Sequence, residues 1–107
     1  MSIAPGKNLT GEEIELFEEY AQKEGVSKRA RSEGQIVDQF KMYGGVDQLP
    51  EHWQEKRKGF IARHGVSYQN HPTYRRYLAL IMWGYLPNEM PPKIPGEVEE
   101  LVDENIG

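Results

Sequence analysis

The tripeptide Gly25-Val26-Ser27 returns 40 residues later as Gly65-Val66-Ser67, and each copy is followed by methionine, an aromatic residue and glycine. These second matches are Met42-Tyr43-Gly44 and Met82-Trp83-Gly84, again 40 residues apart. Sequence that repeats at such an interval is typical of repeated supersecondary units. We therefore expect two tandem helical hairpins, with function in the loops that differ between the copies.

The first hairpin is expected over residues 10–49. Thr10-Gly11-Glu12-Glu13 predicts a capping box that opens a helix over 11–24, because the Thr and Glu side chains can each satisfy a free amide of the first turn. Gly25 would end that helix in the left-handed conformation. Ser32-Glu33-Gly34-Gln35 predicts a second capping box and the second helix of the hairpin.

The second hairpin is expected over residues 50–86, with helices over 50–64 and 72–85. Gly65 would end the first of these helices, as Gly25 does in the other copy. Arg57 falls on the apolar stripe of that helix, so it needs either a carboxylate partner or a path to water for its head group. The helix over 72–85 is apolar almost all the way round, which indicates a central core position or half of an interface.

The remaining segments complete an all-α domain of 107 residues. We expect residues 1–9 to be a flexible N-terminus. Four prolines predict an extended connector over 87–96. A short acidic helix is expected over 97–105, too short to be stable unless it docks on the hairpins.

Charge is divided along the chain into three blocks. Residues 1–25 carry two lysines against six glutamates, and residues 84–107 carry one lysine against six acidic residues. Residues 26–83 carry ten lysines or arginines against five acidic residues. The basic middle would either bind an anionic partner or be neutralised by the chain's own ends, and neutralisation is the simpler expectation.

The composition favours a cytoplasmic protein. The chain has no cysteine, and residues 1–5 lack the charged and apolar regions of a signal peptide. The longest apolar stretch, 77–86, is about half the length that spans a bilayer, so no membrane partner is expected. A small acidic chain of this kind suits a regulator or assembly factor of a phage or mobile element.

The segment Ile61-Ala62-Arg63-His64-Gly65-Val66-Ser67-Tyr68-Gln69-Asn70 resembles the turn and early recognition helix of the helix-turn-helix in repressors of the lactose-repressor type. The resemblance implies DNA reading by the residues after the turn. It covers about ten residues and ends at His71, where the motif has an aliphatic residue, and at Pro72, which would interrupt the recognition helix. No family is assigned on this basis.

No pattern of residues in the sequence indicates a catalytic site. The three histidines, His52, His64 and His71, have no zinc-site spacing, and there is no cysteine nucleophile or glycine-rich phosphate loop. We therefore expect no enzyme, no metal and no cofactor.

The first functional hypothesis is a small non-enzymatic protein-binding module, an adaptor or inhibitor that acts through the aromatic helix and the acidic ends. Its partner is another protein of unknown identity, and a homodimer is a further alternative. The interface would use Trp53, Tyr77, Trp83 and Tyr85.

The alternative is a nucleic-acid-binding regulator that uses the basic middle, with Tyr68 or Tyr74 available to stack on a base. The anion contacts would be Lys28, Arg29, Arg31, Lys56, Lys58, Arg75 and Arg76.

Overall fold

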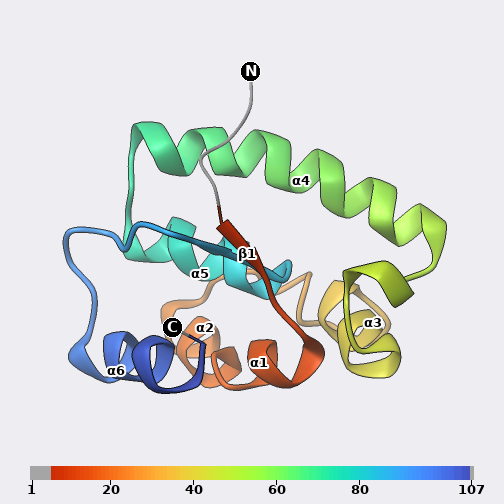
Figure 1. Cartoon of the computed structure of the whole chain (residues 1–107), viewed down its shortest axis with the longest axis horizontal. Helices are drawn as coiled ribbons and strands as arrows, with labels where there is room; N and C mark the ends of the chain where they lie inside the picture. The colour runs from red at the N-terminus through yellow and green to blue at the C-terminus, as the bar shows by residue number, and fades with distance from the viewer. Residues whose placement is uncertain (1–5, 107) are drawn as a thin grey trace.

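Helix α5 (Tyr74–Met82) lies at the centre of the computed structural model, which describes residues 6–106. Five of its side chains have no exposed surface: Tyr77, Leu78, Leu80, Ile81 and Met82. Helix α4 (Glu51–Asn70) packs on one side of α5, and α2 (Glu18–Glu24) packs against it as well (Figure 1). The apolar circumference of this helix therefore reflects a core position.

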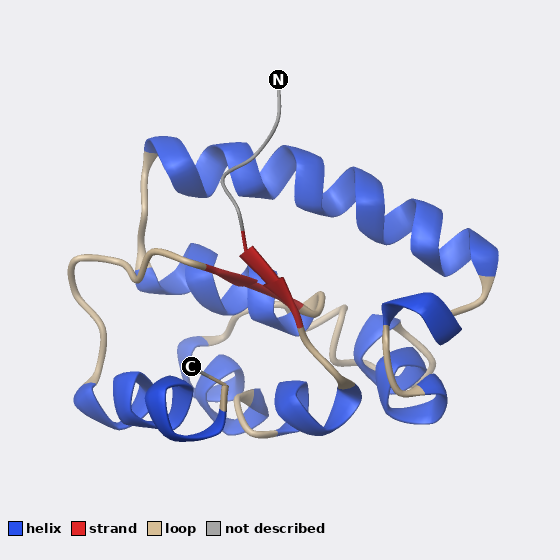
Figure 2. Cartoon of the chain, viewed as in Figure 1, coloured by secondary structure: helices blue, strands red, loops and turns tan. Residues whose placement is uncertain are grey.

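The other elements form a mostly helical fold in which α4 covers one side of α5, while α1, α2 and α6 form the opposite layer and α3 closes one end (Figures 1 and 2). Their bounds are α1 (Gly11–Glu15), α3 (Ile36–Tyr43), a 3₁₀ helix (Val46–Gln48) and α6 (Gly96–Asn105). The predicted short C-terminal helix is thus present, and it docks through the buried Val98 and Val102.

A small antiparallel sheet, which the sequence analysis did not predict, joins the first described residues to the segment that follows α5. Strand β1 (Gly6–Asn8) pairs with β2 (Tyr85–Pro87), with Lys7 opposite Leu86. Leu9 follows with 1% of its surface exposed, and its amide donates to the carbonyl of Gly84 at 2.8 Å. The expected flexible N-terminus over 1–9 is therefore wrong for residues 6–9, and residues 1–5 lie outside the described chain.

The first predicted capping box is confirmed, but the helix it opens is shorter than expected. Thr10 Oγ1 accepts from the Glu13 amide at 3.2 Å, and Glu13 Oε1 accepts from the Thr10 amide at 2.9 Å. A turn at Leu16 and Phe17 then separates α1 from α2. In this turn the backbone amides of Leu16 and Phe17 donate to the carbonyls three residues earlier, those of Glu13 and Ile14. The buried stripe continues across this turn, because Phe17 is fully enclosed.

The second predicted capping box is wrong. Helix α3 begins only at Ile36, and Gly34 adopts a left-handed φ of +77°. The Ser32 hydroxyl donates to the carbonyl of Lys28 at 2.8 Å, so it does not cap the helix. The carboxylate of Asp38 instead accepts from the Gly34 amide at 2.8 Å, which closes the loop that leads into α3.

The two Gly-Val-Ser copies have different structures, so the tandem hairpin repeat is not confirmed. Gly25 ends α2 with a φ of +68°, whereas Gly65 is buried inside α4, which continues to Asn70. The expected helix end at 64 is wrong, and so is the helix-turn-helix interpretation of that segment. The physical reason is Tyr68, which buries its ring and recovers the free energy of about 1 kcal/mol that a glycine costs inside a helix.

Within residues 6–106 Arg57 is buried without a carboxylate partner, and its head group does not reach water either, so neither expected arrangement is present. Its Nε donates to the carbonyl of Trp83 at 2.8 Å, and its Nη2 donates to the carbonyl of Gly84 and to Asn8 Oδ1, both at 2.9 Å. These carbonyls follow the C-terminal end of α5, where the helix dipole favours a positive charge. Arg57 thereby joins α4 to the end of α5 and to β1, although burial lowers its pKa to about 10.

Buried tyrosines should make the fold sensitive to alkali. Burial raises the pKa of Tyr74 and Tyr77 to about 12 and also raises the pKa of Tyr68, whereas free tyrosine titrates near pH 10. The folded chain then keeps protons that the unfolded chain loses, so we expect the free energy of unfolding to fall between about pH 10 and 12. Tyrosinate absorbance, with the chain unfolded in guanidinium as the control, measures this. Native tyrosines that all titrate near 10 would contradict it.

Candidate binding groove

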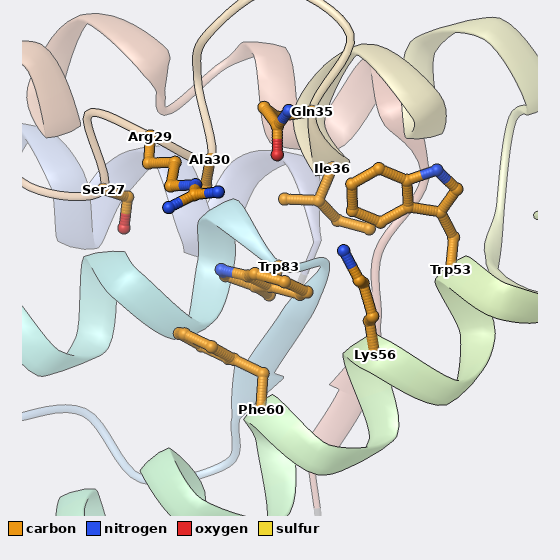
Figure 3. Close-up of a pocket in the computed structure, with 9 residues that line it drawn as sticks. All are labelled: Ser27, Arg29, Ala30, Gln35, Ile36, Trp53, Lys56, Phe60 and Trp83. Atoms are coloured by element: carbon orange, nitrogen blue, oxygen red, sulfur yellow. The ribbon is translucent and has the colours of Figure 1, made fainter.

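A cavity of about 330 Å³ opens between α3, α4, the end of α5 and the loop that precedes α3 (Figure 3). We call it the aromatic-cationic groove. Its lining residues are Ser27, Arg29, Ala30, Gln35, Ile36, Trp53, Lys56, Phe60 and Trp83.

Two lining rings, those of Phe60 and Trp83, form one wall of the groove, and their stack continues beyond the lining to His64. The ring of Phe60 lies 4.2 Å from that of Trp83 at 10° on one face, and 4.0 Å from that of His64 at 22° on the other. Trp53 stands across the groove, with Lys56 Nζ 5.0 Å from its ring centroid (Figure 3). Lys56, Phe60 and His64 follow one another at intervals of four residues, about one helical turn, so all three lie on the same face of α4.

The lining carries two cations, Arg29 and Lys56, and no carboxylate. Within residues 6–106 the ion pairs are Lys41 with Glu18, and Arg75 with Glu24 at 3.9 Å. The groove cations therefore have no acidic partner in this part of the chain. The acidic layer of α1, α2 and α6 lies on the other side of α5 (Figure 1), so the predicted neutralisation of the basic middle reaches Arg75 and Lys41 but not the groove.

The structure divides the other predicted anion contacts. Lys28 and Arg31 flank Arg29 in the loop, where Arg31 Nε also donates to the carbonyl of Val26 at 2.9 Å. This loop holds Ser27 at a φ of +55°, a strained value for a residue with a side chain. A left-handed residue directly before these cations fixes the direction in which the loop leaves α2.

Three of the predicted contacts do not belong to the groove. Lys58 lies two residues from both Lys56 and Phe60, which puts it on the opposite side of α4. Arg75 and Arg76 lie at the far end of α5, about 12 Å along its axis from Trp83. Arg75 donates to the Glu24 carbonyl and Arg76 to the His71 carbonyl, so both are engaged in local contacts.

The predicted aromatic interface is also divided. Trp53 and Trp83 line the groove, whereas Tyr77 is fully buried and Tyr85 is 9% exposed, so neither presents a surface to a partner. Tyr68 is buried with its hydroxyl donating to the Glu89 carbonyl at 2.8 Å, and it is not a stacking surface. The sequence analysis did not single out Phe60, although its spacing of four from Lys56 and from His64 was a usable signal.

The described residues contain no group of three or more histidines and carboxylates placed to hold a metal ion. His64 stacks on Phe60, and partial desolvation together with the charge of Arg63 lowers its pKa. The arrangement offers ring faces and positive charge, which are means of binding.

Between residues 6 and 106, no helix has both the length and the apolar character that a membrane crossing requires. The chain matches no protein-family model, no curated protein and no solved structure significantly. The groove and its charges therefore carry the functional argument by themselves.

Proposed function

We propose that this chain is a small, cytoplasmic, non-enzymatic binding module that holds single-stranded nucleic acid in the aromatic-cationic groove. The observation that carries the proposal is the meeting of a stacked aromatic wall with two cations that have no acidic partner among residues 6–106. Stacking platforms beside a positively charged path are the means by which proteins bind single strands.

A single strand suits the groove better than a duplex. The cavity is about 330 Å³, which is near the lower end of ligand pockets and accommodates one planar group at a time. Each base stacked on an aromatic side chain contributes about 1–3 kcal/mol, and phosphates would follow Arg29 towards Lys28 and Arg31. The acidic layer on the other side of α5 would repel the strand, and so restrict binding to this face.

Binding of a labelled mixed-sequence oligonucleotide, as DNA and as RNA, tests this by fluorescence anisotropy at several salt concentrations. We expect Arg29→Ala with Lys56→Ala to weaken binding at least about tenfold and to reduce the salt slope by about 0.7 for each lost contact. The matched control is Lys58→Ala with Lys93→Ala, which removes the same charge away from the groove. Equal losses in the two double variants would place the strand elsewhere.

The second candidate is the protein-binding adaptor or inhibitor. The specific observation in its favour is an exposed apolar pair at the end of α3, where Met42 is 68% and Tyr43 is 42% exposed. In this candidate, Met42 and Tyr43 take the place of the buried Tyr77 and Tyr85 as the contact residues. No oligonucleotide binding at low salt, together with self-association that Met42→Ser and Tyr43→Ser abolish, would favour it over the first.

A further inference from the structure

The geometry points to a nucleotide subsite: one base stacks on Trp83 as a further ring of the aromatic wall, and its phosphate lies between Arg29 and Lys56. This inference rests on the proposed function and narrows it to a ligand unit, a nucleoside 5′-monophosphate or the same unit within a strand. Three features of the groove support it.

The first feature is the position of Trp83 at one end of the stack. His64, Phe60 and Trp83 follow one another at centroid distances of 4.0 and 4.2 Å, so Phe60 is covered on both faces. Within residues 6–106 the ring stack of Trp83 is with Phe60 on one face, and Figure 3 shows its other side towards Arg29, Gln35 and Ile36, which line the cavity. A planar base entering the cavity would continue the stack at this face.

The second feature is the placement of the two cations around that face. Arg29 comes from the loop and Lys56 from α4, so they approach the cavity from different elements, and both head groups are drawn towards it in Figure 3. A guanidinium and an ammonium held on two elements can contact one phosphate from two directions. A flat apolar ligand without an anion would leave both charges unused.

The third feature is a polar side chain that can read the edge of the base. The side-chain carboxamide of Gln35 lines the cavity and makes no hydrogen bond within residues 6–106, whereas its backbone N–H donates to the carbonyl of Ser32 at 3.1 Å. An amide offers both donors and acceptors, so it can discriminate between bases. Gln35 directly precedes α3, which fixes its backbone.

Titration of the full chain with nucleoside 5′-monophosphates tests the subsite by nuclear magnetic resonance. The chain has two tryptophans and so two indole N–H signals, which the spectrum of Trp53→Phe assigns. We expect saturable shifts of the Trp83 signal from the ring current of the base. Inorganic phosphate alone should compete without producing that shift, and the nucleoside without phosphate should bind about tenfold more weakly.

Variants separate the parts of the subsite. Arg29→Ala with Lys56→Ala should weaken the monophosphate about tenfold or more and leave the nucleoside within about twofold. Gln35→Leu should reduce the differences in affinity among the four bases, whereas Gln22→Leu, on the exposed side of α2, should retain them. Affinity that rises with oligonucleotide length identifies the ligand as a strand, and affinity independent of length identifies a free nucleotide.

The outcomes distinguish this inference from the proposed function. Oligonucleotides that bind through the two cations, while monophosphates leave the Trp83 signal unmoved, would overturn the subsite and leave the proposed function standing. A monophosphate affinity that is unchanged in the Arg29 and Lys56 double variant would also overturn it. If neither oligonucleotides nor monophosphates bind, both proposals are wrong.

Discussion

Replacing Arg57 by methionine is expected to lower the free energy of unfolding by about 3 kcal/mol. Methionine keeps the apolar stem, but it removes the donors to Trp83 O, Gly84 O and Asn8 Oδ1. A buried acceptor left without a donor costs about 1–3 kcal/mol, and this cost falls on the Trp83 carbonyl, because Gly84 O still accepts from the Leu9 amide and Asn8 is exposed. Relief from burying the guanidinium offsets part of that loss, since burial alone already lowers the Arg57 pKa to about 10.

Two further variants test the cause of this loss, measured by urea unfolding. Lys58→Met removes a cation from the next residue of α4 and should change stability by about 0.5 kcal/mol or less, because Lys58 is exposed. Arg57→Lys keeps the charge at the end of α5 but loses the planar fork, so it should retain only a minor part of the stability. If Arg57→Met costs no more than Lys58→Met, the three hydrogen bonds contribute nothing net.

Local signals in the sequence identified most helices but could not fix where each one ends. Gly25 and Gly65 stand in the same tripeptide, yet only Gly25 caps a helix. After Ser27 the chain continues with the exposed Lys28 and Arg29, whereas after Ser67 it continues with Tyr68, which is buried. Tertiary burial therefore decides the outcome, and a local pattern does not contain it.

The sheet was beyond local reasoning for a related reason. Each strand has three residues, and the pairing joins Gly6 to Pro87 across nearly the whole chain. Gly6 is required there because a Cβ atom would lie 2.8 Å from the Leu86 carbonyl oxygen and would overlap the Tyr85 ring. Such a requirement exists only once the two segments are side by side.

The candidate site was predictable in its parts and not in their combination. Trp53 and Trp83 were assigned to one hypothesis, and Arg29 and Lys56 to the other, whereas the fold brings all four to a single cavity. The apolar stripes of the helices favoured a protein interface, because sequence alone does not show which stripe is buried in the core. In the structure most of α5 is buried in the core, and Trp83 is only partly buried at the edge of the core.

Gly84→Ala is expected to be the other strongly destabilising substitution, with a loss of about 3 kcal/mol or more. Gly84 has a φ of +78°, which costs a residue with a side chain about 1–2 kcal/mol. A Cβ atom there would also lie 2.8 Å from Phe40 Cε1 and closer still to Cζ, and Phe40 is fully buried. The carbonyl of Gly84 accepts from Leu9 and from Arg57, so a displaced backbone would weaken both bonds.

Gly44→Ala is the matched control, because Gly44 follows the other Met-aromatic pair and also has a positive φ, of +99°. Nothing lies within 4 Å of a Cβ atom at Gly44, so this variant should lose only the backbone part of the stability. The difference between the two variants in urea unfolding then measures the overlap with Phe40. Adding Phe40→Leu to Gly84→Ala should recover part of that difference, since leucine has no atom at the position of Cζ. Equal losses at Gly44 and Gly84 would mean that the core around Phe40 yields freely. Trp83, which this turn holds between α5 and β2, would then lack the rigid support that a stacking surface needs.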